Sequence, residues 1–191
     1  AGPLPQCACR NRARARSRAQ AVNGARARVG SRRRLEATLR RFNSIAPLSD
    51  AETLLIEQAA SHYEVARAGA ELLSEHDPSP VPRLLLSGWA CRQRVLADGR
   101  RQIFDLLAPG DTIGLSGQPL PLSRASTVAL TRVETADATV LRAAATDPQT
   151  SPALARILAV TPSIEEERLM NHVVRLGRLT ARERIAALFD E

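Results

Sequence analysis

The chain has 191 residues, and 44% of them are hydrophobic, which is enough to build a core of ordinary size. No apolar run approaches the roughly 18 residues needed to cross a bilayer, so we expect a soluble protein with no membrane partner. The formal net charge of +7 is the difference between 27 basic residues, all of them arginine, and 20 acidic ones. Residues 1–34 contain ten of these arginines and no acid, which leaves the rest of the chain mildly acidic.

The arginine-rich segment 1–34 is predicted to be a disordered arm. Its stretch RARARSRAQAVNGARARV has no apolar period that buries a face, and its like charges repel one another. Three interpretations stay open for this arm: a contact with nucleic-acid phosphates, a targeting leader, or a translated leader without a function.

Two short helices are predicted to begin the ordered part. Leu35, Leu39, Phe42 and Ile45 recur at helical spacing. A second helix is expected to run to Ala60, beginning at the capping box that Ser49 and Glu52 form.

A series of short strands separated by turn residues predicts a small antiparallel barrel. Asp98-Gly99 indicates a two-residue hairpin of type I′, and Pro109-Gly110-Asp111 breaks the chain again shortly afterwards. Trp89 and Phe104 are expected to be the bulkiest members of the core. The predicted strands are Tyr63–Ala66, Glu71–Ser74, Arg83–Trp89, Gln93–Ala97, Gln102–Leu107, Ser126–Leu130 and Thr139–Arg142.

Three helices are predicted after the barrel. Ser151-Pro152 favours a helix start, and this helix should run through Leu158. Pro162 is expected to open a separate helix that reaches about Leu176 and is broken by Gly177. The last helix should begin at a second capping box, formed by Thr180 and Glu183.

The combined pattern resembles the Crp/Fnr family of bacterial transcription regulators over roughly residues 34–191. The residues that carry the resemblance are Gly69, Gly88, Asp98-Gly99, Pro109-Gly110-Asp111, Ile113-Gly114, Val128-Ala129-Leu130-Thr131, Leu176-Gly177-Arg178 and Glu183-Arg184-Ile185-Ala186. The resemblance implies a mainly β fold with flanking helices, in which an antiparallel jelly-roll (double-stranded β-helix) barrel is followed by a long dimerisation helix.

The implied domains are a disordered arm (1–34), a cyclic-nucleotide-binding-like barrel with flanking helices (35–160), a dimerisation helix (161–178) and the first helix of a truncated helix-turn-helix domain (179–191). The alternative for residues 161–178 is a helix that folds back on its own barrel. A hinge is expected at Gly177, Arg178, Leu179 and Thr180. The implied homodimer interface consists of Ile164, Leu169, Met170, Val173, Val174 and Leu176.

The resemblance also implies an effector-binding segment after the Gly-Asp turn. Members that bind cyclic nucleotides place a Glu directly after the glycine that corresponds to Gly114, and an Arg further along the chain. Here Leu115 stands in place of the Glu. Counting back from Thr131 puts Ser123 in place of the Arg. Pro119 and Pro121 disfavour the short helix of that segment. Cyclic nucleotide is therefore disfavoured, and a small effector, a redox signal or no ligand remain open. The candidate residues are Gly114, Leu115, Ser116, Gly117, Ser123, Arg124 and Ala125.

No cofactor or metal is predicted. Only Cys7, Cys9 and Cys91 are present, whereas an iron–sulfur cluster held by thiolates needs four, and their odd number suits a reducing cytoplasm. His62, His76 and His172 lie too far apart for a metal motif or to suggest haem.

No catalytic constellation is recognisable, so an enzyme is not expected. The sequence instead predicts the sensory and dimerising portion of a cytoplasmic transcription regulator, whose DNA contacts come from a C-terminal domain outside this chain. The alternative is a stand-alone dimerising module that titrates relatives into heterodimers.

Overall fold

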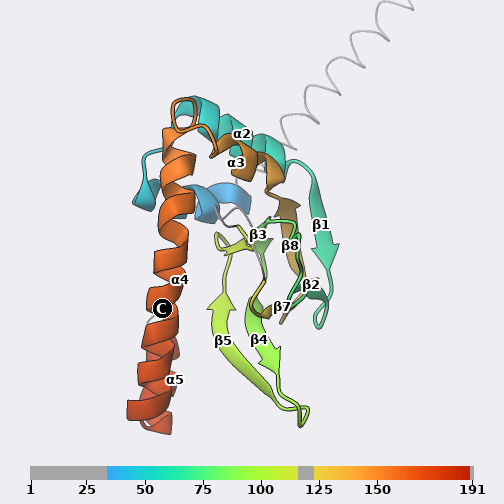
Figure 1. Cartoon of the computed structure of the whole chain (residues 1–191), viewed down its shortest axis with the longest axis vertical. Helices are drawn as coiled ribbons and strands as arrows, with labels where there is room; N and C mark the ends of the chain where they lie inside the picture. The colour runs from blue at the N-terminus through green and yellow to red at the C-terminus, as the bar shows by residue number, and fades with distance from the viewer. Residues whose placement is uncertain (1–33, 116–122, 190–191) are drawn as a thin grey trace, which may run out of the picture. The chain divides into compact units, whose positions relative to one another are not determined.

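The computed structural model describes residues 34–115 and 123–189, in which two four-stranded sheets form a barrel with helices around it (Figure 1). One sheet has the strand order β1-β8-β3-β6 and the other β2-β7-β4-β5, and the neighbouring strands pair antiparallel. This architecture confirms the predicted jelly roll. The strands are β1 (Tyr63–Ala66), β2 (Glu71–Leu73), β3 (Arg83–Ser87), β4 (Ala90–Val95), β5 (Arg101–Leu107), β6 (Thr112–Ile113), β7 (Ser126–Ala129) and β8 (Val133–Asp137).

Two groups of buried side chains stabilise the barrel, and alternation along β3 separates them. Leu85 packs with Ala90, Leu107 and their neighbours from both sheets. Leu84 and Leu86 instead pack with apolar residues of the helices, including Phe42 and Ile56. The helices therefore cover the outer face of the β1-β8-β3-β6 sheet.

The helices before the barrel form where they were predicted. Residues 34–45 are helical. The helix α2 (Asp50–Ala60) begins at Ser49, whose side chain accepts the Glu52 N–H while the Glu52 carboxylate accepts the Ser49 N–H, so the capping box is confirmed.

Trp89 is not a core residue, contrary to the prediction. Its side chain is 50% exposed, because β3 ends at Ser87 and Gly88 turns the chain at φ +80°. Phe104 is partly buried. Phe42 of helix 34–45 is the aromatic residue buried in the core, and aliphatic residues fill the rest.

The hairpin between β4 and β5 does not have the predicted type I′ turn. Gly99 has φ +81°, but among the described residues His76 is the only non-glycine with positive φ, so Asp98 does not adopt the required conformation. The Gly99 N–H donates to the Leu96 carbonyl, and the Leu96 N–H donates to the Arg100 carbonyl. The hairpin thus has a three-residue loop that ends in a left-handed glycine.

The predicted strand Thr139–Arg142 is wrong, because these residues form the helix α3 (Thr139–Ala144). The strand lies just before it, at β8, and its sequence VETAD contains two acids that disfavour strands. Pairing with both β1 and β3 holds β8 at the centre of its sheet and overrides this local preference.

The helix α4 (Pro152–Arg178) is continuous over 27 residues, so the predicted break at Pro162 and the predicted end before Gly177 are both wrong. An interior proline costs a helix about 3 kcal/mol. Packing on both sides of Pro162 offsets this: Leu154 and Ile157 are buried before it, and Ile164 packs against the barrel after it. Figure 1 shows α4 running along one side of the barrel.

A last helix, α5 (Ala181–Phe189), follows α4 after a short interruption. Thr180 and Glu183 form the predicted capping box at its start. Within residues 34–115 and 123–189, no helix combines the length and the apolar character that crossing a membrane requires.

Candidate sensory site and its contact with the long helix

The predicted effector-binding segment is described only in part. Ser116 and Gly117 lie outside the described residues. Leu115, at the position where the resemblance implies a Glu, is 4% exposed and belongs to the core group beneath the helices. The buried Ser123 hydroxyl donates to the carbonyl of Ala125 at 2.8 Å. Neither side chain presents the carboxylate or guanidinium that a ribose phosphate requires.

Arg124 is exposed, and its backbone carbonyl accepts a hydrogen bond from Arg94 at 2.6 Å. Arg94 also pairs with the Glu75 carboxylate at 2.6 Å. Gly114 has φ +64°, as its turn requires. The role of these residues in effector binding stays a prediction.

A different group of charged residues lies where the barrel meets α4. Arg92 of β4 and Asp105 of β5 are register partners, and their side chains pair at 2.5 Å. The register pair Ala90 and Leu107, two positions along, faces the core between the sheets. Because side chains two positions apart share a face, Arg92 and Asp105 point to the inner side of their sheet.

Two residues of α4 complete this contact. Glu165 pairs with Arg92 at 2.9 Å. Arg168 approaches Asp105 at 3.7 Å and Asp111 at 3.2 Å. The middle of α4 is therefore joined to β4, to β5 and to the turn that follows β5.

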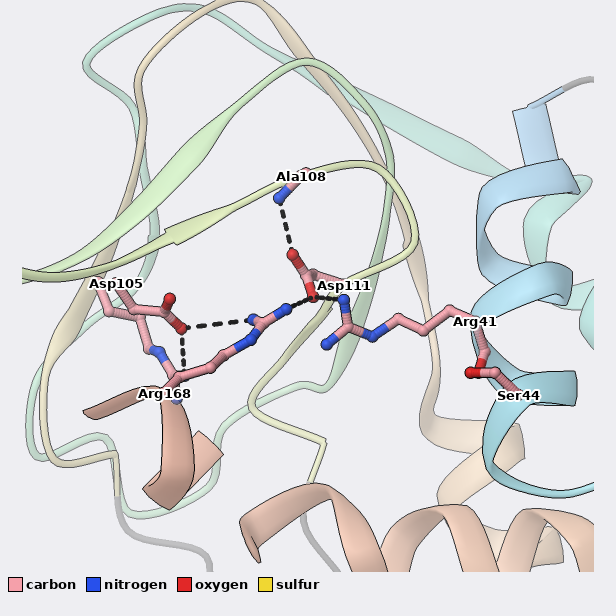
Figure 2. Close-up of polar contacts among 7 residues, drawn as sticks. Arg41, Ser44, Asp105, Ala108, Asp111 and Arg168 are labelled. Carbon is pink, nitrogen blue, oxygen red and sulfur yellow. Dashed lines mark hydrogen bonds and ion pairs between the residues drawn. The ribbon is translucent and has the colours of Figure 1, made fainter. Parts of the chain in front are cut away.

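Asp111 is the junction of this contact, as Figure 2 shows. Its carboxylate is 4% exposed and accepts the Ala108 N–H at 2.8 Å, which closes the turn. The same carboxylate pairs with Arg168 and with Arg41 of helix 34–45, the latter at 2.5 Å. One side chain thus links the first helix, the barrel and α4.

We call these six residues the barrel–helix network: Arg41, Arg92, Asp105, Asp111, Glu165 and Arg168. Its three guanidinium groups and three carboxylates balance in charge. Burial tends to lower the pKa of Arg92, but Glu165 and Asp105 outweigh this effect and raise it. Burial lowers the pKa of Arg41, and Asp111 offsets this incompletely.

A cavity of about 20 Å³ adjoins the barrel–helix network. Its lining includes Arg41, Thr161, Ile164 and Arg168. This volume holds about one water molecule and excludes an organic effector.

The barrel–helix network was missed at the level of the sequence. Its members lie on five separate segments, and the pairing of Arg92 with Asp105 depends on the register between β4 and β5. That register changes just beyond Arg92, where a β-bulge interrupts the pairing, so it is not readable from the residues alone. The one local signal was Asp111 in a Pro-Gly-Asp turn.

Five of the six predicted dimer residues form an exposed apolar stripe on α4. Ile164 does not belong to it: nine residues, about two and a half turns, separate Ile164 from Val173, and Ile164 lines the cavity on the barrel side. The stripe therefore faces away from the barrel. It consists of Leu169 (46% exposed), Met170 (58%), Val173 (61%), Val174 (57%) and Leu176 (44%).

The predicted hinge residues end α4 and begin α5. Gly177 and Arg178 are still helical, and Leu179 is extended, with φ −91° and ψ 142°. Arg184 of α5 donates to the carbonyls of Leu179 and Leu176, at 3.0 and 3.2 Å. The direction of the chain changes at Leu179, and motion there stays a prediction.

No three His, Cys, Asp or Glu side chains gather in a way that suits a metal ion within the part of the chain that the structure describes. Cys91 is buried, and its burial raises the pKa of its thiol although Arg101 acts in the opposite direction.

The barrel, its flanking helices and the long helix define the class of the protein as one with the fold of a cyclic-nucleotide-binding domain. A cyclic-nucleotide-binding domain from Methylobacillus flagellatus shares this fold, with a TM-score of 0.55 and 21% identity over 76% of this chain and 86% of that one. No family model matches the sequence.

Two further proteins are similar to this chain in sequence. The transcriptional activator FnrL of Cereibacter sphaeroides is 26% identical over 152 residues, which are 78% of this chain and 58% of that protein. The structure of FixK2 from Bradyrhizobium japonicum is 30% identical, with a TM-score of 0.56, over 67% of this chain and 63% of that one. In sequence and in fold, the chain is therefore similar to regulators of the Crp/Fnr family. The chain spans about three fifths of the length of these two relatives.

Proposed function

We propose that this chain is the sensory and dimerising part of a cytoplasmic, non-catalytic transcription regulator of the Crp/Fnr type. FnrL is a transcriptional activator, which supports a role in transcription. A change at the barrel would act on the regulator by shifting the balance between two arrangements of α4.

The exposed apolar stripe of α4 is the observation that carries this proposal. Leu169, Val173 and Leu176 follow the four-then-three spacing of a coiled-coil seam, and Met170 and Val174 flank it. An apolar stripe of this length on a surface helix marks an interaction site. A second copy of the same helix, related by a twofold axis, supplies a matching stripe.

DNA binding belongs to the same proposal. In a regulator of this type, α5 would open the DNA-binding domain, and Leu179 with Thr180 would be the joint through which α4 positions it. The remaining length of FnrL and FixK2 leaves room for such a domain in those relatives. The effector is proposed not to be a cyclic nucleotide, because Leu115 and Ser123 replace the expected carboxylate and guanidinium.

Sedimentation equilibrium of Val173→Glu tests the dimer. A charge placed in the stripe has no partner and should convert the dimer to a monomer. The matched control is Asn171→Glu, which adds the same charge at an exposed position on the other side of α4 and should leave the dimer intact. A dimer that survives Val173→Glu contradicts the proposed interface.

Chromatin immunoprecipitation tests the regulatory role in the native host. The tagged product of the whole gene should enrich a set of promoters, and Val173→Glu in that gene should abolish the enrichment. The absence of promoter enrichment for the unmodified protein contradicts a role in transcription.

A further inference from the structure

We propose that the barrel–helix network is a ligand-independent latch that holds the middle of α4 on the barrel and so sets the position from which the apolar stripe is presented. This inference deepens the proposed function, since it says how barrel and helix communicate. Its test uses a monomeric variant, so the result does not depend on the proposed dimer.

The position of the barrel–helix network along α4 is the first argument. The start of the helix is held by apolar packing, with Ala153, Leu154 and Ile157 all buried. The stripe begins at Leu169, directly after Arg168. Glu165 and Arg168 therefore make the last described ion pairs between α4 and the barrel before the stripe begins.

The second argument is that the barrel–helix network is complete without a ligand. Arg92 pairs with both Asp105 and Glu165, and Asp111 pairs with both Arg41 and Arg168. Each charge in the contact faces an opposite charge, so no external anion or cation is required to neutralise it. The adjoining cavity of about 20 Å³ leaves no room for an organic molecule.

The third argument is that the latch connects β5, the turn after it and helix 34–45 to α4. Asp105 lies on β5, Asp111 lies in the following turn, and that turn is pressed against helix 34–45: a Cβ on Gly110 would lie 2.9 Å from the Ala37 backbone. A displacement of β5 or of this turn would therefore break ion pairs to α4. Because the pairs are partly buried, removing one partner leaves the network with an excess charge of the opposite sign.

Hydrogen–deuterium exchange of the α4 amides after Thr161 tests the latch in the monomeric Val173→Glu background. There, Glu165→Gln should speed exchange of residues 164–176 by about three- to tenfold, since local opening no longer breaks the pair with Arg92. The matched control is Glu167→Gln, which neutralises an exposed acid two residues away and should change exchange by less than about twofold.

A double-mutant cycle of Arg92→Gln and Glu165→Gln separates the pair from general effects on the helix. If the two residues form a latch, the double variant should exchange about as fast as the faster single variant. The latch would be overturned if the two substitutions increased the exchange rate independently, so that their factors multiplied in the double variant. It would also be overturned if Glu165→Gln exchanged at the same rate as its Val173→Glu background. Both results leave the dimer proposal untouched, because the background is already monomeric.

Discussion

The carboxylate of Glu52 on α2 accepts the backbone N–H of Leu154 on α4 at 3.0 Å, across 102 residues of sequence. The same oxygen accepts the Ala153 N–H at 2.9 Å. The other oxygen accepts the Ser49 N–H and hydroxyl, at 2.9 and 2.8 Å. One buried carboxylate therefore caps the helix it belongs to and also supplies the cap of the long helix, whose own Ser151 makes no side-chain cap.

We expect Glu52→Gln to lower the free energy of unfolding by about 1–3 kcal/mol, because a neutral amide accepts these hydrogen bonds more weakly and has one acceptor oxygen instead of two. Urea unfolding at pH 7 measures the change. The control Glu36→Gln alters an exposed acid on helix 34–45 and should be nearly neutral. Equal stability of the two variants would contradict the capping role of Glu52.

The pH dependence of stability gives a second measurement on Glu52. Burial raises the pKa of this carboxyl, but the donors of Ser49, Leu154 and Ala153 outweigh burial and lower it in the folded state. A lowered folded pKa contributes stability that is complete above the unfolded value of about 4.3 and is lost as the pH falls through the folded pKa. The difference in stability between the unmodified protein and Glu52→Gln should therefore shrink in acid. A difference that is constant from pH 7 to about pH 3 would contradict this assignment.

Local chemistry in the sequence was enough to predict the caps, the jelly roll and the place of the β4–β5 turn, although not the type of that turn. The Ser49–Glu52 and Thr180–Glu183 boxes depend on contacts three residues apart, so the sequence contains all the information they need. The predictions that were wrong concerned segments whose structure depends on residues far away in the sequence. Pro162 stays helical because α4 packs against the barrel on both sides of it, and β8 forms because two strands hold it.

In the candidate site, too, features set by local spacing were predicted and features set by distant contacts were not. The apolar stripe on α4 follows helical spacing and was found from the sequence, apart from Ile164, whose exclusion required knowing which side of α4 faces the barrel. The barrel–helix network could not be predicted, because Arg92 and Asp111 become neighbours of Arg168 only after the barrel has closed.

Gly88→Ala should destabilise the protein by about 3 kcal/mol or more. Its φ is +80°, and an added Cβ would lie 2.3 Å from the Arg132 carbonyl oxygen, so the backbone must move. Gly69 has nearly the same φ, +82°, but an added Cβ there meets nothing within 4 Å. Gly69→Ala should therefore show only the strain of a left-handed backbone, about 1–2 kcal/mol. The difference in stability between the two variants, measured by thermal unfolding, gives the steric contribution at Gly88. Equal losses of stability would contradict the close approach there.

Isothermal titration calorimetry with cyclic AMP and cyclic GMP should detect no binding at nucleotide concentrations on the order of 100 µM. The expectation follows from the burial of Leu115 in the core and from the Ser123 hydroxyl bonding to Ala125, since neither residue offers charge to a ribose phosphate. Residues 116–122 are included in the test because the whole chain is titrated. A micromolar dissociation constant would show that the remaining segment supplies the missing contacts.

The Cys91 thiol should react slowly with a disulfide reagent in the native protein. It is fully buried, and burial raises its pKa, so the thiolate that attacks is both scarce and covered. In a Cys7→Ser/Cys9→Ser variant, in which Cys91 is the one thiol left, we expect labelling at pH 8 to be at least about tenfold slower than in the denatured protein. Because the folded pKa is raised, the native rate should keep rising at pH values where the rate of the denatured protein has levelled off. Labelling at the denatured rate would mean that β4 opens readily, and a strand that opens cannot hold Arg92 in place against Glu165.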